Sequence, residues 1–377
     1  MKICILCFDL SNNSLGRAGL LAMALASRYE VEIIGPSRSG DIWFPMKDMD
    51  IPIRSYPWKR YPFFISTIRK MIKDIDADIL IACKLRPTSF GIALIKKWVS
   101  NIPVILDIDD WELGFFYHTG FWGKVGRFLN FSNPNGLPYT WLMEYFTGYA
   151  DSTIVGNRFL ENKFSGSLIY HCRDTSKLNP ENFDTDGMKA KLGLEGKRVV
   201  MFLGTPRPHK GTGELFTAME KISDPDIRLV LVGAGSSVQG YIDNMKINQD
   251  KVIVIPKIPF NELPDYLSAA DILAIPQRDT TDTQGQIPAK LFDGMAMAKP
   301  IITTPISDIP EVLGGHGYLI EPGNPEQLAK TIKNIFANPE EARLKGQNAR
   351  KRCQELYDLK VIKKELTSKI EKLTTTQ

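Results

Sequence analysis

A glycine-flanked turn at residues 204–211 carries two bases whose types and spacing suit the binding of a diphosphate. Arg207 offers a planar fork of donors to phosphate oxygens, and Lys210 offers a compact point charge. Gly204, at the start of the turn, lets the backbone approach an anion closely. We therefore expect these three residues to contact a diphosphate. Two exposed bases in an ordinary loop are the alternative.

A second polar stretch, residues 278–286, lies between an apolar run and a helical pattern. Residues 272–275 are typical of a buried strand, and apolar residues recur at helical spacing from Ile287 to Ala298. In parallel sheets, ligands bind beyond the carboxyl ends of the strands. The start of the following helix suits an anion, and Asp293 is placed to accept hydrogen bonds from a sugar diol.

Three aspartates, Asp107, Asp109 and Asp110, follow another predicted buried strand at residues 103–106. The carboxyl end of a parallel strand is a common position for chemistry. Two interpretations stay open, because such carboxylates bind metal ions or simply cap a loop. His118 is a rival for any catalytic role in this region, and an ordinary loop residue is the alternative for it.

The elements that must position these residues indicate an α/β chain of about two domains. The chain has 377 residues, and its 43% hydrophobic content is enough for two cores. Further buried strands are expected at residues 1–8, 31–34, 78–82, 198–203, 228–232 and 252–255. The polar stretch at residues 174–186 is interpreted as the linker.

Composition argues against several classes of function. No apolar run approaches the roughly 20 residues of a membrane helix, and residues 1–8 are too short for a signal peptide. The five cysteines are scattered without zinc-site spacing, which indicates buried thiols in a reducing cytosol. The net charge of +4 is too small to indicate a nucleic-acid partner. We expect a cytoplasmic protein.

Aromatic and basic residues interleave in two segments of the first half, residues 56–73 and 115–149. The first contains Lys59, Arg60 and Arg69, and the excess positive charge of the chain also lies in this half. Such a mixture suits an anionic membrane surface. The alternatives are a helix packed on its own core and a large helical insertion packed on the sheet.

The stretch around Asp293 resembles the donor-site signature of retaining glycosyltransferases of family 4, which have the GT-B fold. Residues 288–296 read Pro-Ala-Lys-Leu-Phe-Asp-Gly-Met-Ala, and Lys-Pro follows at 299–300. The family usually carries two glutamates separated by seven residues, where this chain has Gly285 and Asp293. It also has Ala298 in place of a family glycine. The family's first acid lies near the transferred sugar.

The resemblance implies two Rossmann-like domains that face each other across a cleft. The first domain is expected at residues 1–175, with a C-terminal helix at 356–377 packing back on it, and the donor domain at 176–355. Asp293 is expected to bind the ribose of the donor. The expected donor-binding residues are Gly16, Gly204, Lys257, Ile258, Gly285, Gln286, Ile287, Pro288, Lys290 and Asp293.

The same resemblance implies three catalytic residues. By register, Asp109 takes the place of a family histidine that points at the transferred sugar, and a carboxylate there can orient a hydroxyl or accept its proton. Arg207 and Lys210 would neutralise the leaving diphosphate. The family retains the anomeric configuration and needs no metal ion, so no cofactor is expected besides the nucleotide-sugar co-substrate.

We therefore expect a retaining glycosyltransferase that acts on a glycan or lipid-linked acceptor. It would be cytoplasmic, with a peripheral position at the inner membrane face suggested by the aromatic and basic segments. Two alternatives stay open. One is a nucleotide-sugar epimerase, which shares the GT-B architecture, and the other is a non-catalytic protein that only binds a nucleotide.

Overall fold

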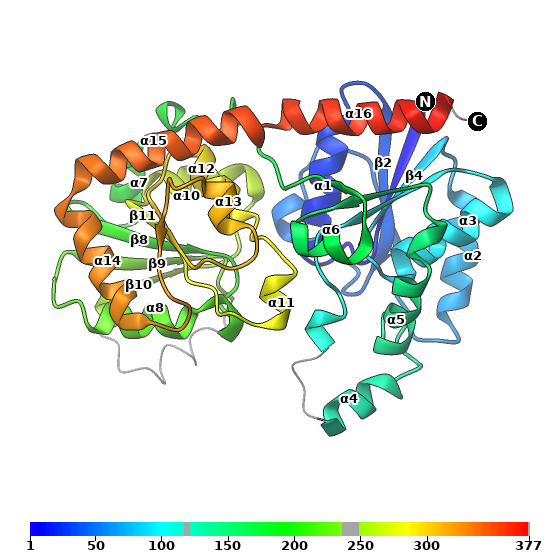
Figure 1. Cartoon of the computed structure of the whole chain (residues 1–377), viewed down its shortest axis with the longest axis horizontal. Helices are drawn as coiled ribbons and strands as arrows, with labels where there is room; N and C mark the ends of the chain where they lie inside the picture. Colours follow the sequence, from blue (N-terminus) through cyan, green and yellow to red (C-terminus); the bar gives the residue numbers. More distant parts are fainter. Residues whose placement is uncertain (117–120, 236–248, 376–377) are drawn as a thin grey trace. The chain divides into compact units, whose positions relative to one another are not determined.

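The computed structural model describes residues 1–116, 121–235 and 249–375 (Figure 1). The chain divides into two compact units. Unit 1 comprises Met1–His171 and Lys360–Gln377, and unit 2 comprises Cys172–Leu359. The chain therefore passes between the units twice, and unit 2 is one continuous segment.

Unit 1 is built on a seven-stranded parallel sheet in the order β3-β2-β1-β4-β5-β6-β7. Its central strands are buried along their whole length, as expected for a parallel sheet covered on both faces. The strands are β1 (Lys2–Cys7), β2 (Glu30–Ser37), β3 (Ile53–Pro57), β4 (Ile79–Cys83), β5 (Val104–Ile108), β6 (Ser152–Val155) and β7 (Ser167–Leu168). The helices are α1 (Ser14–Leu25), α2 (Phe64–Asp74), α3 (Ile92–Ser100), α4 (Phe121–Phe128), α5 (Leu137–Tyr145), α6 (Arg158–Phe164) and α16 (Leu359–Thr375).

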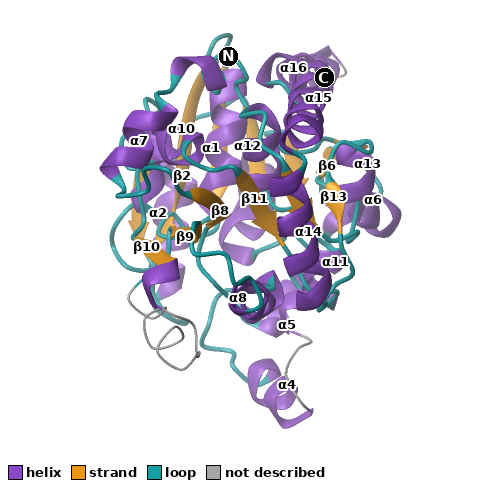
Figure 2. Ribbon diagram, turned by 90° about the vertical axis from the view of Figure 1, so that its left-hand side faces the viewer, coloured by secondary structure: helices purple, strands orange, loops and turns teal. Residues whose placement is uncertain are grey.

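Unit 2 is built on a six-stranded parallel sheet in the order β10-β9-β8-β11-β12-β13. Figure 2 shows β8 to β11 side by side with helices around them. The strands are β8 (Arg198–Leu203), β9 (Ile227–Val232), β10 (Val252–Ile255), β11 (Ile272–Ile275), β12 (Ile301–Thr303) and β13 (Tyr318–Leu319). The helices are α7 (Thr185–Lys191), α8 (Thr212–Glu220), α10 (Leu263–Ser268), α11 (Thr281–Gln284), α12 (Lys290–Ala296), α13 (Ile309–Leu313), α14 (Pro325–Ala337) and α15 (Pro339–Leu356).

The predicted α/β class with two parallel sheets is confirmed, but one loop differs. The polar, glycine-containing residues 9–19 are typical of a flexible loop after the first strand, whereas α1 already begins at Ser14. The carboxylate of Asp9 accepts hydrogen bonds from the backbone N–H of Ser11 and from the amide of Asn12, which orders the short connection. Gly16 therefore lies in the first turn of α1 and not in a loop.

The two passages of the chain lie next to each other inside unit 2. The backbone N–H of Arg173 donates to the carbonyl of Tyr357 at 3.0 Å, and the N–H of Leu359 donates to the carbonyl of Arg173 at 2.9 Å. The hydroxyl of Thr175 donates to the carboxylate of Asp358. Because these bonds tie both passages into unit 2, the units meet at 171/172 and 359/360, four residues from the predicted boundaries.

No disulfide joins any of the five cysteines, all of which are buried in the part of the chain that the structure describes. Within the described ranges, no helix is long and apolar enough to cross a membrane. The helix at the C-terminus, α16, packs on unit 1, where Arg28 pairs with Glu371 across their exposed surface.

Candidate functional site

The loops that follow β8 and β11 form the candidate site of unit 2. The two strands are neighbours in the sheet, so their carboxyl ends bring the loops together. The N–H of Arg278 donates to the carbonyl of His209 at 3.0 Å. Gly211 adopts a positive φ of +69°, and a Cβ there would lie 1.6 Å from the carbonyl oxygen of Pro276. Only glycine allows the loops to pack this closely.

Two lysines, one from each loop region, lie within electrostatic range of each other. The Nζ of Lys290 donates to the carbonyl of Leu203 at 2.7 Å and lies 3.8 Å from the ring centroid of Phe202. Burial, together with the charge of Lys210, holds the pKa of Lys290 well below its usual value. The Nζ of Lys210 donates to the carbonyl of Thr205 at 3.1 Å. A bound anion would relieve the repulsion between these two groups.

The other predicted residues of the turn after β8 frame this pair. Gly204 has a φ of +93°, a left-handed conformation, and its N–H donates to the carbonyl of Val232 at 2.7 Å. The side chain of Arg207 is exposed. Lys257 is also exposed and Ile258 is half-buried, but both follow the edge strand β10, which β9 separates from β8.

The loop after β11 is more ordered than the sequence predicted. The short helix α11 lies within the expected polar loop, and α12 begins at Lys290, so Ile287 precedes the helix although its spacing placed it inside. A capping box at Thr280 starts α11, and Gly285 lies buried at its end. Gln286 donates to the carbonyl of Asp282 at 3.1 Å. The donor-binding roles of Gly285, Gln286, Ile287 and Pro288 stay predictions.

Asp293 has a protein partner that sequence patterns do not reveal. The Nη2 of Arg173 donates to one carboxylate oxygen at 3.0 Å, and the Nε donates to the other. Both side chains are buried, with 6% of the arginine and 5% of the aspartate exposed. The predicted role of Asp293 in binding ribose stays a prediction, and its carboxylate is already oriented by Arg173.

The first of the three aspartates in unit 1 is committed to an arginine. Asp107 lies 2.7 Å from the Nη2 of Arg17, and both side chains are at most 1% exposed. Arg17 also donates to the carbonyls of Ile169 and Tyr170 at 3.0 and 3.1 Å. This pair links β5 to α1 and to the segment after β7, so Asp107 contributes to the packing of unit 1.

The other two aspartates converge on one buried lysine. The Nζ of Lys84 lies 2.8 Å from Asp109 and 3.3 Å from Glu112, and it also contacts Asp110. Burial acts to raise the pKa of Asp109, but Lys84, His171 and Arg17 outweigh it and hold the value below normal. Burial raises the pKa of Asp110 to about 7. The two adjacent carboxyls therefore differ in acidity.

The metal-ligand interpretation of the aspartates gains no support from this arrangement. In the part of the chain that the structure describes, no group of three His, Cys, Asp or Glu residues is arranged to hold a metal ion. His118, the rival catalytic residue, lies outside the described residues. At Gly16, a Cβ would meet only the ring of Trp43 at an ordinary 3.6 Å, so the expected role of Gly16 in donor binding also stays a prediction.

Large apolar side chains are exposed on unit 1. Phe63 at the entry of α2 is 72% exposed, and Trp122 on α4 is 81% exposed. Tyr61 connects these regions, because its N–H donates to the carbonyl of Ser132 at 2.8 Å and its ring packs on Tyr139. A fully packed insertion therefore does not describe this segment. In the described parts of residues 56–73 and 115–149, the exposed large apolar residues are Phe63, Ile65, Trp122, Phe128, Leu129, Phe131, Trp141, Leu142, Tyr145 and Tyr149.

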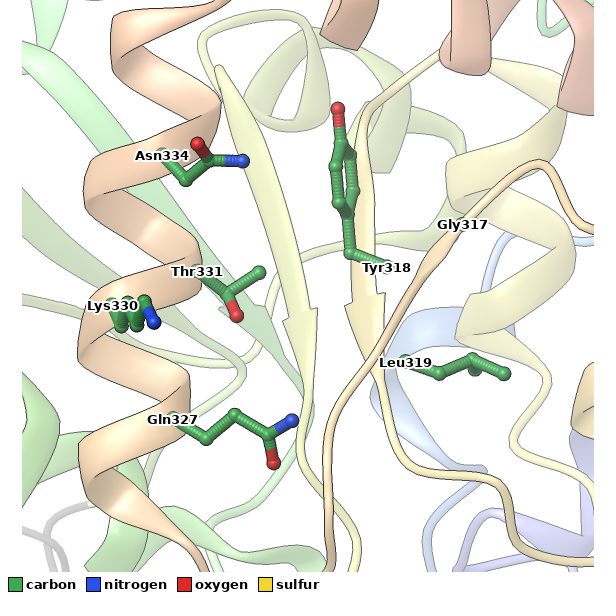
Figure 3. Close-up of a pocket in the computed structure, with 7 residues that line it drawn as sticks. All are labelled: Gly317, Tyr318, Leu319, Gln327, Lys330, Thr331 and Asn334. Carbon is green, nitrogen blue, oxygen red and sulfur yellow. The ribbon is translucent and has the colours of Figure 1, made fainter.

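A shallow pocket lies elsewhere in unit 2, between β13 and α14 (Figure 3). The side chains of Tyr318, Gln327 and Asn334 border it. None of the residues that line it is a predicted site residue. Its place at the edge strand of the sheet separates it from the loops after β8 and β11.

Comparison with known proteins identifies what this arrangement is similar to. Residues 197–338 match the model of a family described as Glycosyl transferases group 1. The putative teichuronic acid biosynthesis glycosyltransferase TuaC of Bacillus subtilis is 28% identical over 277 residues, which cover 71% of this chain and 64% of that protein. The chain spans 63%, 58% and 64% of the length of three curated relatives that it matches.

Solved structures share the fold along the whole chain. Sucrose-phosphate synthase from Thermosynechococcus elongatus has a TM-score of 0.75 at 16% identity, with all of both chains covered. Anabaena HepE in complex with UDP-glucose has a TM-score of 0.75 at 15% identity, covering 99% of this chain and 100% of HepE. This likeness confirms the predicted GT-B class, an α/β fold with two Rossmann-like units.

Proposed function

Because residues 197–338 match the model of the family described as Glycosyl transferases group 1, we propose that the chain transfers a sugar from a nucleotide-sugar donor to an acceptor. The reaction class follows the family 4 resemblance, with the anomeric configuration retained and no metal ion required. The loops after β8 and β11 hold the donor. This function is favoured over an epimerase because relatives such as TuaC are named glycosyltransferases.

The observation that carries the proposal is the position of Lys290, whose Nζ donates to the carbonyl of Leu203 at the end of β8, beside the turn that contains Lys210. An anion bound beside these two lysines would relieve their mutual repulsion, and a diphosphate at the carboxyl ends of the neighbouring strands β8 and β11 meets that requirement. Negative charge develops on the leaving diphosphate in the transition state, where preorganised cations stabilise it most. Arg207, exposed in the same turn, supplies a further cation.

In unit 1, Asp109 and Asp110 supply carboxyls at the end of β5 for the acceptor side of the reaction. Asp109 stays ionised because of Lys84, which suits the orientation of a hydroxyl. The pKa of Asp110, raised to about 7, suits proton exchange near neutral pH. These roles are hypotheses that variant kinetics can separate.

The proposed acceptor is lipid-linked and lies at an anionic membrane surface on the cytoplasmic side. The exposed apolar side chains near α2 and α4 support this proposal. Basic residues on the same helix entry are exposed as well, among them Lys59, Arg60, Arg69 and Lys70. Apolar and basic side chains together are what a peripheral membrane helix requires.

The test is calorimetric binding of UDP and GDP to the intact chain and to two variants. Lys210→Ala and Arg207→Ala should each weaken binding by about 1.5–3 kcal/mol, because each removes a charge-assisted contact. Lys330→Ala, which removes an exposed lysine of α14, is the matched control. Unchanged affinity in both site variants would remove the turn after β8 from the donor site.

A panel of nucleotide sugars then separates the alternatives. Transfer to an acceptor, or slow hydrolysis of the donor, supports the proposed reaction. An epimerised nucleotide sugar would show the alternative enzyme, and binding without turnover would show a nucleotide-binding protein. The same panel identifies the transferred sugar. Gly285 replaces the family's first acid, which lies near that sugar, so this replacement should affect the choice of sugar most directly.

A further inference from the structure

Arg173 is a buried arginine whose side chain and backbone are both hydrogen-bonded. Its guanidinium donates to Cys172 O at 2.7 Å, to Ala289 O at 3.1 Å and to both carboxylate oxygens of Asp293. Its backbone is bonded on both sides, to Tyr357 and to Leu359. The residue is only 5% exposed, so neither its backbone nor its side chain has room to reorient.

These contacts fix the start of α12 as well as the carboxylate. Helix α12 has only seven residues, so its orientation depends on tertiary contacts more than on its own hydrogen bonds. Arg173 binds the carbonyl of Ala289, which precedes the helix, and the carboxylate of Asp293 within it. The ring of Phe292 packs edge-on against the ring of Tyr357, with 5.2 Å between the ring centroids, and this contact also holds α12 in place.

An ionised carboxylate accepts about four hydrogen bonds, and the fork of Arg173 uses one position on each oxygen of Asp293. The remaining positions can accept the two hydroxyls of a ribose. A bidentate arginine holds the plane of the carboxylate, whereas a lysine would hold only one point of it. The direction of the free lone pairs therefore depends on Arg173.

We propose that Arg173 is a positioning residue for ribose recognition, acting through Asp293. The inference rests on the proposed function, because it requires that a nucleotide binds beside α12. Arg173 does not touch the nucleotide, so it affects the sugar of the nucleoside and not the diphosphate. Its loss should abolish discrimination between ribose and deoxyribose while leaving the contacts of Arg207 and Lys210, in the turn after β8, in place.

The experiment compares UDP with 2′-deoxy-UDP and 3′-deoxy-UDP by calorimetry, with GDP and its deoxy forms used if GDP binds more tightly. The intact chain should bind the ribonucleotide about tenfold more tightly than either deoxy form, the effect of a hydrogen bond to a charged group. In Arg173→Lys and Arg173→Gln, this ratio should fall to within about twofold of one. Affinity for 2′,3′-dideoxy-UDP, which has neither hydroxyl for Asp293 to accept, should change little.

The affinity for the dideoxy form is the internal control for folding, because it reports the contacts of the base and the diphosphate without the two hydroxyls. Arg173→Lys preserves the buried positive charge. If Arg173→Gln binds neither nucleotide, the ratio measured for Arg173→Lys tests the inference. A ratio near ten in a variant that binds would overturn the inference and leave Arg173 as a structural residue. Equal binding of ribo and deoxy forms by the intact chain would also overturn it, while the proposed function stands. An intact chain that binds no nucleotide would overturn both.

Discussion

Replacing Lys84 by methionine should destabilise unit 1 by about 3–5 kcal/mol near neutral pH, the usual cost of removing one partner from a buried ion pair. The side chain of Lys84 is 6% exposed, and its ammonium contacts the carboxyls of Asp109, Asp110 and Glu112, the last of which also pairs with Arg86. Without it, three carboxyls lie close together in a poorly hydrated region. Methionine preserves much of the side-chain volume, so packing changes contribute little.

The free energy of unfolding lost in Lys84→Met should depend on pH, and the ion pairs of Lys84 determine the direction of that dependence. Removing the cation raises the pKa values of Asp109 and Asp110 in the folded state above those in the intact chain. Carboxyls with raised folded pKa values stabilise the protein at low pH, and this contribution is lost as the pH rises through them. The difference between the intact chain and Lys84→Met should therefore be largest at about pH 8 and smaller at about pH 5.

Urea unfolding followed by tryptophan fluorescence measures this difference selectively, because all six tryptophans lie in unit 1. The matched control is Lys97→Met, which breaks a pair with Asp151 whose side chains are 23% and 31% exposed. Surface pairs of this kind contribute about 1 kcal/mol or less. Equal losses in the two variants, or a larger loss for Lys84→Met at the lower pH, would refute the reasoning.

Three further predictions follow from other parts of the molecule. Asp109→Asn should lower turnover in steady-state kinetics and leave the donor dissociation constant nearly unchanged. Full activity in this variant would show that Asp109 is not catalytic and would make Asp110 the next candidate. Ala298→Gly should stabilise unit 2 by about 1 kcal/mol in calorimetry, since Ala298 has a φ of +52°, whereas Ala296→Gly inside α12 should destabilise it. The chain should sediment with anionic but not zwitterionic vesicles, more weakly as salt rises. Each basic residue near an anionic surface contributes about 1 kcal/mol to vesicle binding. Replacing Lys59, Arg60, Arg69 and Lys70 by glutamine should therefore weaken co-sedimentation with the vesicles.

Local patterns in the chain were enough to predict the α/β class and the strands that carry the candidate site. The run at 272–275 is observed as β11 with the same bounds, and residues 198–203 are observed as β8. Buried parallel strands are continuous apolar runs, so their signal is local. Because the carboxyl ends of such strands share one edge of a sheet, the positions of Lys210 and Asp109 at strand ends also followed from sequence.

The partners of these residues are contacts between distant parts of the chain, and no local pattern contains them. Arg173 meets Asp293 across 120 positions, and Lys84 meets Asp110 across 26. The acidity of Lys290 and of Asp110 depends on burial and on these neighbours, so it cannot be derived from residue type. The exposure of Trp122 is likewise a property of the packed unit, since the same aromatic sequence is compatible with a core or with a surface.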